Sequence, residues 1–203
     1  MKVIAINGSP KANGNTALAI RKVTDTLNTE GIETETIHIG KMPLRGCMAC
    51  GACSKLGRCA IDDGLNEIAA KMREADGIVI GSPVYYAGVN GTLKSFLDRV
   101  FYQSGGAFRF KPGAAVLAVR RGGALDAYHT INNYFGISQM IQVPANYWNM
   151  VYGSLPGEAE QDLEGMNTME VIGKNMAYLV KMQHESSVPV PEPVPKVMFN
   201  YIR

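Results

Sequence analysis

MKVIAINGSPKANGNT, residues 1–16, joins a short apolar run to a loop rich in Gly and Asn. Residues 3–6 are continuously apolar, which is typical of a strand buried on both faces of a parallel sheet. Residues 15–28, which follow the loop, carry apolar side chains at helical spacing. The order strand, loop, helix is the first half of a βαβ unit, and it predicts an α/β fold.

The alternation continues along the chain. Apolar runs at residues 78–80 and 114–119 predict two more buried strands, and the half-polar segment 32–39 suits an edge strand. A weaker fifth strand is expected near residues 141–143. Five strands that alternate with helices predict a doubly wound parallel sheet. Further helical periodicity falls at residues 63–75, 92–102, 125–135 and 158–183.

Composition narrows the class of protein. The 203 residues are 46% hydrophobic and 19% charged, which is globular composition. No run approaches the roughly 18 apolar residues of a membrane span, and MKVIAINGSP does not have the pattern of a signal peptide. A net charge of +2 is too small an excess of positive charge to indicate binding to nucleic acid or an anionic membrane. We therefore expect a cytoplasmic protein without nucleic-acid or membrane partners.

The loop at residues 8–16 has the chemistry of a phosphate site. Gly and Asn allow tight turns in which successive N–H groups face an anion, and the helix N-terminus adds partial positive charge. The alternative is an ordinary turn in which an asparagine caps the helix. The spacing matches neither a P-loop nor a dinucleotide fingerprint, so a mononucleotide with one terminal phosphate fits better. The side chains expected to contribute are Ser9, Lys11, Asn15 and Thr16.

Two further loops are expected at the same edge of the sheet, because the carboxyl ends of parallel strands lie together. One follows the strand at 78–80, and its tyrosines can stack on a flat ring or hydrogen-bond to it. The other follows the strand at 114–119 and brings positive charge. Together the loops predict a site for a planar cofactor. Their candidate residues are Pro83, Val84, Tyr85 and Tyr86 in one loop and Arg120, Arg121, Gly122 and Gly123 in the other.

The four cysteines form a single motif, C-x2-C-x2-C-x5-C. In a reducing compartment such a cluster indicates metal or redox chemistry rather than disulfides. Four thiolates can complete a tetrahedral zinc site or a [4Fe–4S] cluster, and empty thiols remain an alternative. The successive C-x2-C intervals are closer to ferredoxin loops than to paired zinc knuckles. Asp62 and Asp63, which follow, are expected to form a turn and a helix N-cap. The motif comprises Cys47, Cys50, Cys53 and Cys59.

Several short motifs make a family resemblance specific. GSPK at 8–11, NT at 15–16, SPVY at 82–85 and LKSFLDR at 93–99 resemble the NAD(P)H-dependent FMN reductase branch of the flavodoxin-like proteins, over residues 1–185. The resemblance implies a five-stranded sheet of order 2-1-3-4-5 with a cysteine-rich loop after strand two. It also implies FMN, with phosphate contacts from the first loop and ring contacts from Pro83 to Tyr86 and from Gly122 and Gly123. Lys94, Asp98 and Arg99 are expected to be structural, as a helix-face ion pair or a subunit contact.

The cysteine motif, with AIDD at residues 60–63, is similar to that of the iron–sulfur flavoproteins. This implies a [4Fe–4S] cluster that exchanges electrons singly with FMN, in a homodimer or homotetramer. We thus expect an oxidoreductase that transfers electrons between the cluster, FMN and an unknown partner, with a small redox protein or a pyridine nucleotide as donor. The alternatives are an NAD(P)H-dependent FMN or quinone reductase without a cluster, and a thiol or metal sensor.

The C-terminal segment 186–203 differs in composition. SSVPVPEPVP at residues 186–195 carries four prolines, which favour an extended polyproline conformation. It is interpreted either as a spare tail or as an arm that lies on its own or a neighbouring subunit. Residues 1–185 are expected to form the FMN-binding domain.

Overall fold

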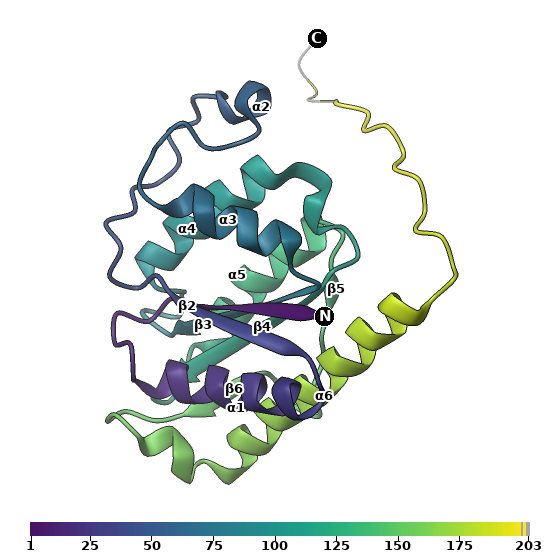
Figure 1. Cartoon of the computed structure of the whole chain (residues 1–203). Coiled ribbons are helices and arrows are strands. Elements are labelled where there is room, and N and C mark those ends of the chain that lie inside the picture. The colour runs from purple at the N-terminus through teal and green to yellow at the C-terminus, as the bar shows by residue number, and fades with distance from the viewer. Residues whose placement is uncertain (200, 202–203) are drawn as a thin grey trace.

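A single parallel sheet forms the centre of the molecule, with helices on both of its faces (Figure 1). The computed structural model describes residues 1–199 and 201. The strand order is β2-β1-β3-β4-β5, which confirms the predicted doubly wound, flavodoxin-like sheet. Every strand pair is parallel. The strands are β1 (Lys2–Asn7), β2 (Glu33–His38), β3 (Gly77–Pro83), β4 (Pro112–Val119) and β5 (Ile141–Gln142).

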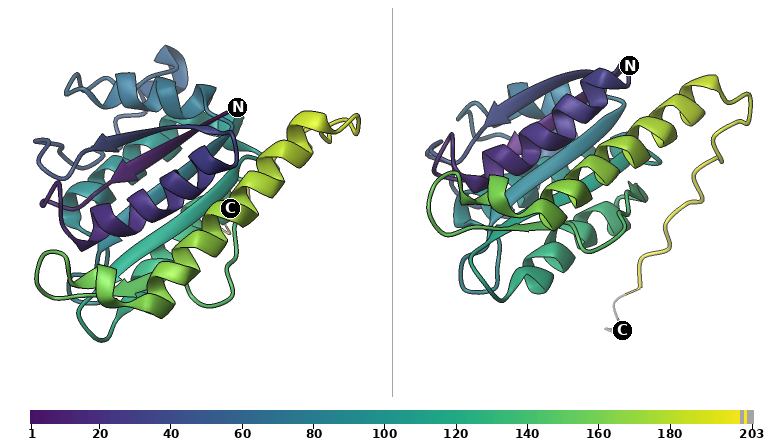
Figure 2. Two further views of the ribbon diagram at one scale, coloured as in Figure 1. Left: turned by 60° about the horizontal axis from the view of Figure 1, so that its bottom comes forward. Right: turned by 90° about the horizontal axis from the view of Figure 1, so that it is seen from below.

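Each face of the sheet buries its own hydrophobic core. Side chains alternate along β1, so that Ile4 and Ile6 pack into one core while Val3 and Ala5 pack into the other. Two helices cover the second face, and Figure 2 shows them side by side: α1 (Asn15–Thr29) and α6 (Leu163–Glu185). The first face is covered by α3 (Leu65–Glu74), α4 (Gly91–Ser104) and α5 (Ala124–Ile137).

The fifth position of the sheet is filled by two short strands rather than one. β5 pairs with the start of β4, where Pro112 lies opposite Ile141. A sixth strand, β6 (Met150–Tyr152), pairs with the end of β4. Strand β5 was expected from the sequence, near residues 141–143, whereas β6 was not. An irregular segment separates them, so neither reaches the length at which an apolar pattern is distinctive.

The last helix starts later than its periodicity indicates. Residues 158–161 form the 3-10 helix η2 (Glu158–Gln161), and α6 begins only at Leu163. Asp162 separates the two, because its carboxylate accepts a hydrogen bond from the N–H of Gly165 at 2.9 Å and caps α6. In the part of the chain that the structure describes, no helix is long and apolar enough to cross a membrane.

Beyond α6 the chain continues without helix or strand along residues 186–199 (Figure 2). Arg109 donates a hydrogen bond from Nη2 to the carbonyl oxygen of Pro191 at 3.2 Å. Farther along, Val194 and Val197 are 89% and 90% exposed. The C-terminal segment therefore carries apolar side chains in solvent. Its expected end at residues 200, 202 and 203 lies outside the described residues.

The cysteine-rich segment follows β2, as expected. It contains one short helix, α2 (Cys53–Leu56), and lies beyond α3 and α4 on the first face of the molecule (Figure 1). The sheet edge at which the strand-end loops meet is a separate region, so the two candidate sites are described in turn.

Candidate functional site

The loop after β1 is shaped by its own polar side chains. Asn7 Oδ1 accepts a hydrogen bond from the N–H of Ser9 at 3.0 Å, and Asn7 Nδ2 donates to the carbonyl oxygen of Ala12 at 3.3 Å. The hydroxyl oxygen of Ser9 accepts from the N–H of Lys11 at 3.2 Å. Asn7 and Ser9 are both buried. The loop is thus folded back on the end of β1 in a fixed shape.

The loop ends at the N-terminus of α1. Leu18 is the first residue whose N–H bonds back along the helix, to the carbonyl oxygen of Gly14 at 3.1 Å. The earlier N–H groups of an α-helix lack such partners and carry partial positive charge. In α1 these groups belong to Asn15, Thr16 and Ala17. The first loop therefore presents donors suited to a phosphate.

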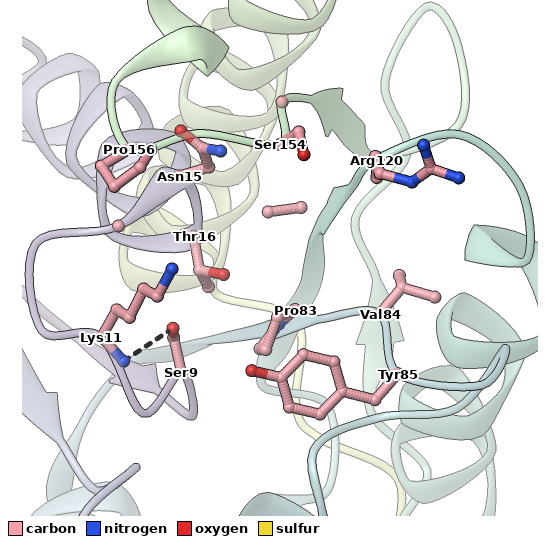
Figure 3. A pocket seen from close by; sticks show the side chains of 13 residues that line it. Ser9, Lys11, Asn15, Thr16, Pro83, Val84, Tyr85, Arg120, Ser154 and Pro156 are labelled. Carbon is pink, nitrogen blue, oxygen red and sulfur yellow. Dashed lines mark hydrogen bonds between the residues drawn. The ribbon is translucent and has the colours of Figure 1, made fainter.

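These donors open into a cavity of about 170 Å³, which we call the sheet-edge pocket. Figure 3 shows Lys11 on one side of it, Arg120 on the opposite side and the ring of Tyr85 along the lower edge. The pocket therefore has a cationic residue on each of two sides. Its lining residues are Ser9, Lys11, Gly14, Asn15, Thr16, Pro83, Val84, Tyr85, Ala118, Arg120, Gly153, Ser154 and Pro156.

The structure brings together eight of the twelve candidate residues named in the three loops. Tyr86, Arg121, Gly122 and Gly123 do not line the pocket. Tyr86 is fully exposed and has φ of +49°. Gly123 is the N-cap residue before α5 and has φ of +84°, and a Cβ there would lie 3.0 Å from Ala87. The second and third loops therefore touch each other next to the pocket.

One wall of the sheet-edge pocket was not expected from the sequence. It is formed by Gly153, Ser154 and Pro156. The side chain of Asn15 holds this wall in place. Its Oδ1 accepts from the N–H groups of Gly157 at 3.1 Å and Ala159 at 3.3 Å, and its Nδ2 donates to the carbonyl oxygen of Leu155 at 3.0 Å. These partners lie at least 140 residues along the chain from Asn15. No local signal in the sequence points to them.

All four cysteines line a second cavity of about 30 Å³, the cysteine hollow. Cys47 and Cys50 are exposed, Cys53 and Cys59 are half-buried, and all four are free thiols. Among the described residues, no three His, Cys, Asp or Glu side chains converge closely enough to hold a single metal ion. The other lining residues are Met48, Ala49, Gly51, Ala60, Ile61, Arg99, Tyr102 and Gln103.

Arg99 of α4 lies behind Cys59 and is almost fully buried. Its guanidinium donates to the sulfur of Cys59 from Nε at 3.4 Å and from Nη2 at 3.3 Å. It also forms a bidentate ion pair with Asp63, at 2.6 and 2.9 Å. The hydrogen bond with Asp63 is the main cause that raises the pKa of Arg99 above its ordinary value, although burial opposes it.

This ion pair shows that Asp63 does not have the role expected from the sequence, whereas Lys94 and Asp98 of the same region do. Asp63 does not cap a helix: Gly64 is the N-cap residue of α3, and no side chain bonds to that helix end. Its partner Arg99 is 36 residues away, which no local pattern reveals. On the exposed face of α4, Lys94 and Asp98 form the expected helix-face ion pair, at 2.6 and 2.8 Å.

The backbone of Cys59 is held as firmly as its sulfur. Its N–H bonds to Oδ1 of Asn66 at 3.0 Å and to Oε1 of Gln103, and its carbonyl oxygen accepts from Nδ2 of Asn66 at 3.0 Å. Gln103 also lines the cysteine hollow, and its buried Nε2 has no hydrogen-bond partner among the described residues. Four thiols beside an unpaired donor fit a group that is itself rich in acceptor sulfur.

The fold and the sheet-edge pocket define a class of protein, the flavodoxin-like proteins that bind a mononucleotide at the carboxyl ends of the strands. The sequence pattern of one family, NADPH-dependent FMN reductase, matches residues 1–154. The chain belongs to this family. It is therefore an FMN-binding flavoprotein and a flavin-dependent oxidoreductase.

Similar proteins agree with this assignment. An iron–sulfur flavoprotein of Methanocaldococcus jannaschii is 41% identical over 190 residues, 90% of this chain and 98% of the relative. An iron–sulfur flavoprotein of Methanosarcina thermophila is 33% identical over 186 residues, 90% and 96% of the two chains. The structure of an archaeal flavodoxin superposes with a TM-score of 0.61 at 15% identity, over 89% of this chain and 99% of that one.

Proposed function

We propose that this oxidoreductase passes electrons between a [4Fe–4S] cluster, FMN and an external redox partner. The observation that carries the proposal is that all four cysteines of the motif line one cavity. Two relatives that share 90% of this chain's length are iron–sulfur flavoproteins, which supports the same assignment. When bound, the cluster would exchange electrons singly and the flavin singly or in pairs.

The sheet-edge pocket divides into a phosphate end and a ring end. At the phosphate end we assign Ser9, Lys11, Asn15 and Thr16, because the start of α1 and the ammonium of Lys11 both favour an anion. The Asn15 side chain is engaged by the 155–159 segment, so we expect its backbone N–H to bind the phosphate.

At the ring end the loop after β3 supplies flat apolar surface. Tyr85 is 46% exposed at the pocket and can cover one face of an isoalloxazine ring. Tyr86 and the loop of Gly122 and Gly123 lie just outside the pocket. We propose that they contact the ring edge or the incoming redox partner. The ring-end residues inside the pocket are Pro83, Val84 and Tyr85.

We further propose that the protein acts as a homodimer or homotetramer. The sheet-edge pocket and the cysteine hollow share no lining residue. A second copy can bring one chain's cysteines toward the other chain's flavin, with residues 1–185 as the FMN-binding domain and residues 186–203 as an arm. The four free thiols in one loop suit a reducing cytoplasm.

The donor decides between this function and that of an NAD(P)H-dependent FMN or quinone reductase without a cluster. Protein purified without oxygen is mixed in a stopped-flow instrument with a reduced ferredoxin-type protein or with NADPH, and FMN reduction is followed by its absorbance. A Cys53→Ser variant, which lacks one proposed ligand, is the matched control. We expect fast reduction by the redox protein, and we expect the variant to lose it.

Two other results would favour the alternative. Rapid turnover of NADPH with equal rates for the wild type and Cys53→Ser would show that the cysteines play no part in electron transfer. Slow reduction by every one-electron donor would have the same meaning.

A further inference from the structure

Arg99 connects the two ends of the cysteine segment. Before the motif, the carbonyl oxygen of Arg45 accepts from Nη1 at 3.2 Å. After the motif, the carbonyl oxygen of Ile61 accepts from Nη2 at 3.2 Å, and Asp63 accepts from both terminal nitrogens. The side chain comes from α4, which is anchored in the core by Phe96 and Val100. One buried guanidinium thus closes the segment and fixes Cys59 against the body of the protein.

The four cysteines are consequently unequal. Cys59 receives two hydrogen bonds on its sulfur from a cation, and its N–H and carbonyl are both bonded. Cys47 and Cys50 lie on the exposed side of the segment. The sulfur of Cys47 accepts from the nearby N–H of Ala49 at 3.4 Å, which is a neutral donor. Positive charge therefore acts on one corner of the cysteine hollow.

We propose that the Arg99–Asp63 pair sets the reduction potential of the group held by the cysteines, acting through Cys59. This inference rests on the proposed function, because it requires a redox-active group in the cysteine hollow. Arg99 is a positioning residue: it touches the ligand sulfur rather than the reacting atoms. Hydrogen bonds to ligand sulfurs and local charge are the means by which proteins adjust iron–sulfur potentials.

The sign follows from electrostatics. Reduction adds negative charge to the cluster, and the guanidinium of Arg99, which is almost fully buried and so weakly screened by water, stabilises that charge. Arg99 therefore raises the potential. Asp63 neutralises part of the guanidinium charge and lowers the potential. Gln103 adds an uncharged donor from the same wall through its unpaired Nε2.

Two variants with opposite expected effects test the proposal. Arg99→Gln removes the cation and both charge-assisted bonds, while Asp63→Asn leaves the cation without its counter-charge. Lys94→Gln is the matched control, because it removes an exposed cation from the same helix. Cluster and FMN potentials are measured in anaerobic holoprotein by redox titration, with iron and FMN content determined for each variant.

We expect the cluster potential to fall in Arg99→Gln and to rise in Asp63→Asn. Each shift should be about tenfold in the reduction equilibrium constant, or about 59 mV for a one-electron couple. The FMN potential and the Lys94→Gln control should not change. Unchanged cluster potentials in both variants at full iron content would overturn the proposal and leave the proposed function intact.

Other outcomes are equally decisive. If Arg99→Gln fails to fold, the cluster potential of Asp63→Asn alone tests the proposal. A rise supports the proposal, and a fall or no change overturns it. If the wild-type protein binds FMN but no iron before and after reconstitution, the proposed function is wrong and this inference falls with it.

Discussion

The backbone of Gly40 lies directly against the carbonyl oxygen of Ser9, and a Cβ on Gly40 would fall 1.9 Å from that oxygen. The same oxygen accepts a hydrogen bond from Nε2 of His38 at 2.7 Å. The end of β2 therefore supports the first loop from behind. This contact connects the start of the cysteine-rich connection to the shape of the proposed phosphate site.

Gly40→Ala should displace the first loop and weaken FMN binding at least about tenfold, because backbone atoms cannot yield to a Cβ as a flexible side chain can. Fluorescence quenching of FMN during titration of the apoprotein measures the Kd. Gly46→Ala is the control, since a Cβ at Gly46 meets nothing within 4 Å. If both variants bind FMN with the same Kd, flavin binding does not depend on the contact between Gly40 and the first loop.

Lys11→Met should weaken binding of FMN but not of riboflavin, which lacks the phosphate. A charge-assisted hydrogen bond contributes about 1.5–3 kcal/mol, so the Kd for FMN should rise about tenfold or more. Lys41→Met serves as a control, because Lys41 is exposed and lies outside the pocket. A loss of equal size for riboflavin would place Lys11 near the ring rather than the phosphate.

Arg120→Gln should lower the FMN potential, because a cation near the pyrimidine side of the ring stabilises the anionic reduced flavin. Arg120 lines the sheet-edge pocket, whereas the neighbouring Arg121 does not. Arg121→Gln should therefore leave the potential unchanged. Spectroelectrochemical titration of the two variants measures the difference, and equal shifts would show that Arg120 acts on the flavin no more specifically than any nearby charge.

The pH dependence of stability should depend in part on Glu170, which joins α1 to α6. Its carboxylate pairs with Lys22 at 2.7 Å and Lys174 at 2.8 Å, and the hydrogen bond from Lys174 is the main cause that lowers its pKa to about 2. Since the ordinary pKa is 4.5, the stabilisation is complete above that value and is lost as pH falls toward about 2.

Glu170→Gln should therefore be less stable than the wild type at pH 6, and the gap should narrow as pH falls below 4.5. The gap should be small, because the pair is exposed. Urea unfolding midpoints measured from pH 6 to pH 3 test this. A gap that stays constant over the range would show that the ion pairs contribute nothing to it.

Much of the fold was predictable because short stretches of sequence determine it. The apolar runs of β1, β3 and β4 and the Gly-rich first loop each depend on neighbouring residues alone. Strand β6 was missed because three residues carry no periodicity. The start of α6 was placed too early because Asp162 interrupts a pattern that continues on both sides.

The candidate site divides in the same way. The sequence pointed to Lys11, Thr16 and Tyr85, which line the sheet-edge pocket, because their loops follow recognisable strands. It pointed to the four cysteines, which line the cysteine hollow, because of their spacing. The wall at Gly153 and Ser154 and the Arg99–Asp63 pair depend on long-range packing. Arg99 was expected to be structural, and its contact with Cys59 joins residues 40 positions apart. Charge patterns along the chain do not reveal which carboxylate or thiol a buried arginine meets.

We propose that one chain holds FMN at the sheet edge and a [4Fe–4S] cluster at the cysteines. The most direct test is to purify the protein without oxygen and to measure iron, acid-labile sulfide, zinc and FMN per chain. We expect about four irons, about four sulfides and about one FMN, with no zinc. One FMN with zinc or vacant thiols would contradict the cluster, and absence of flavin would contradict the whole account.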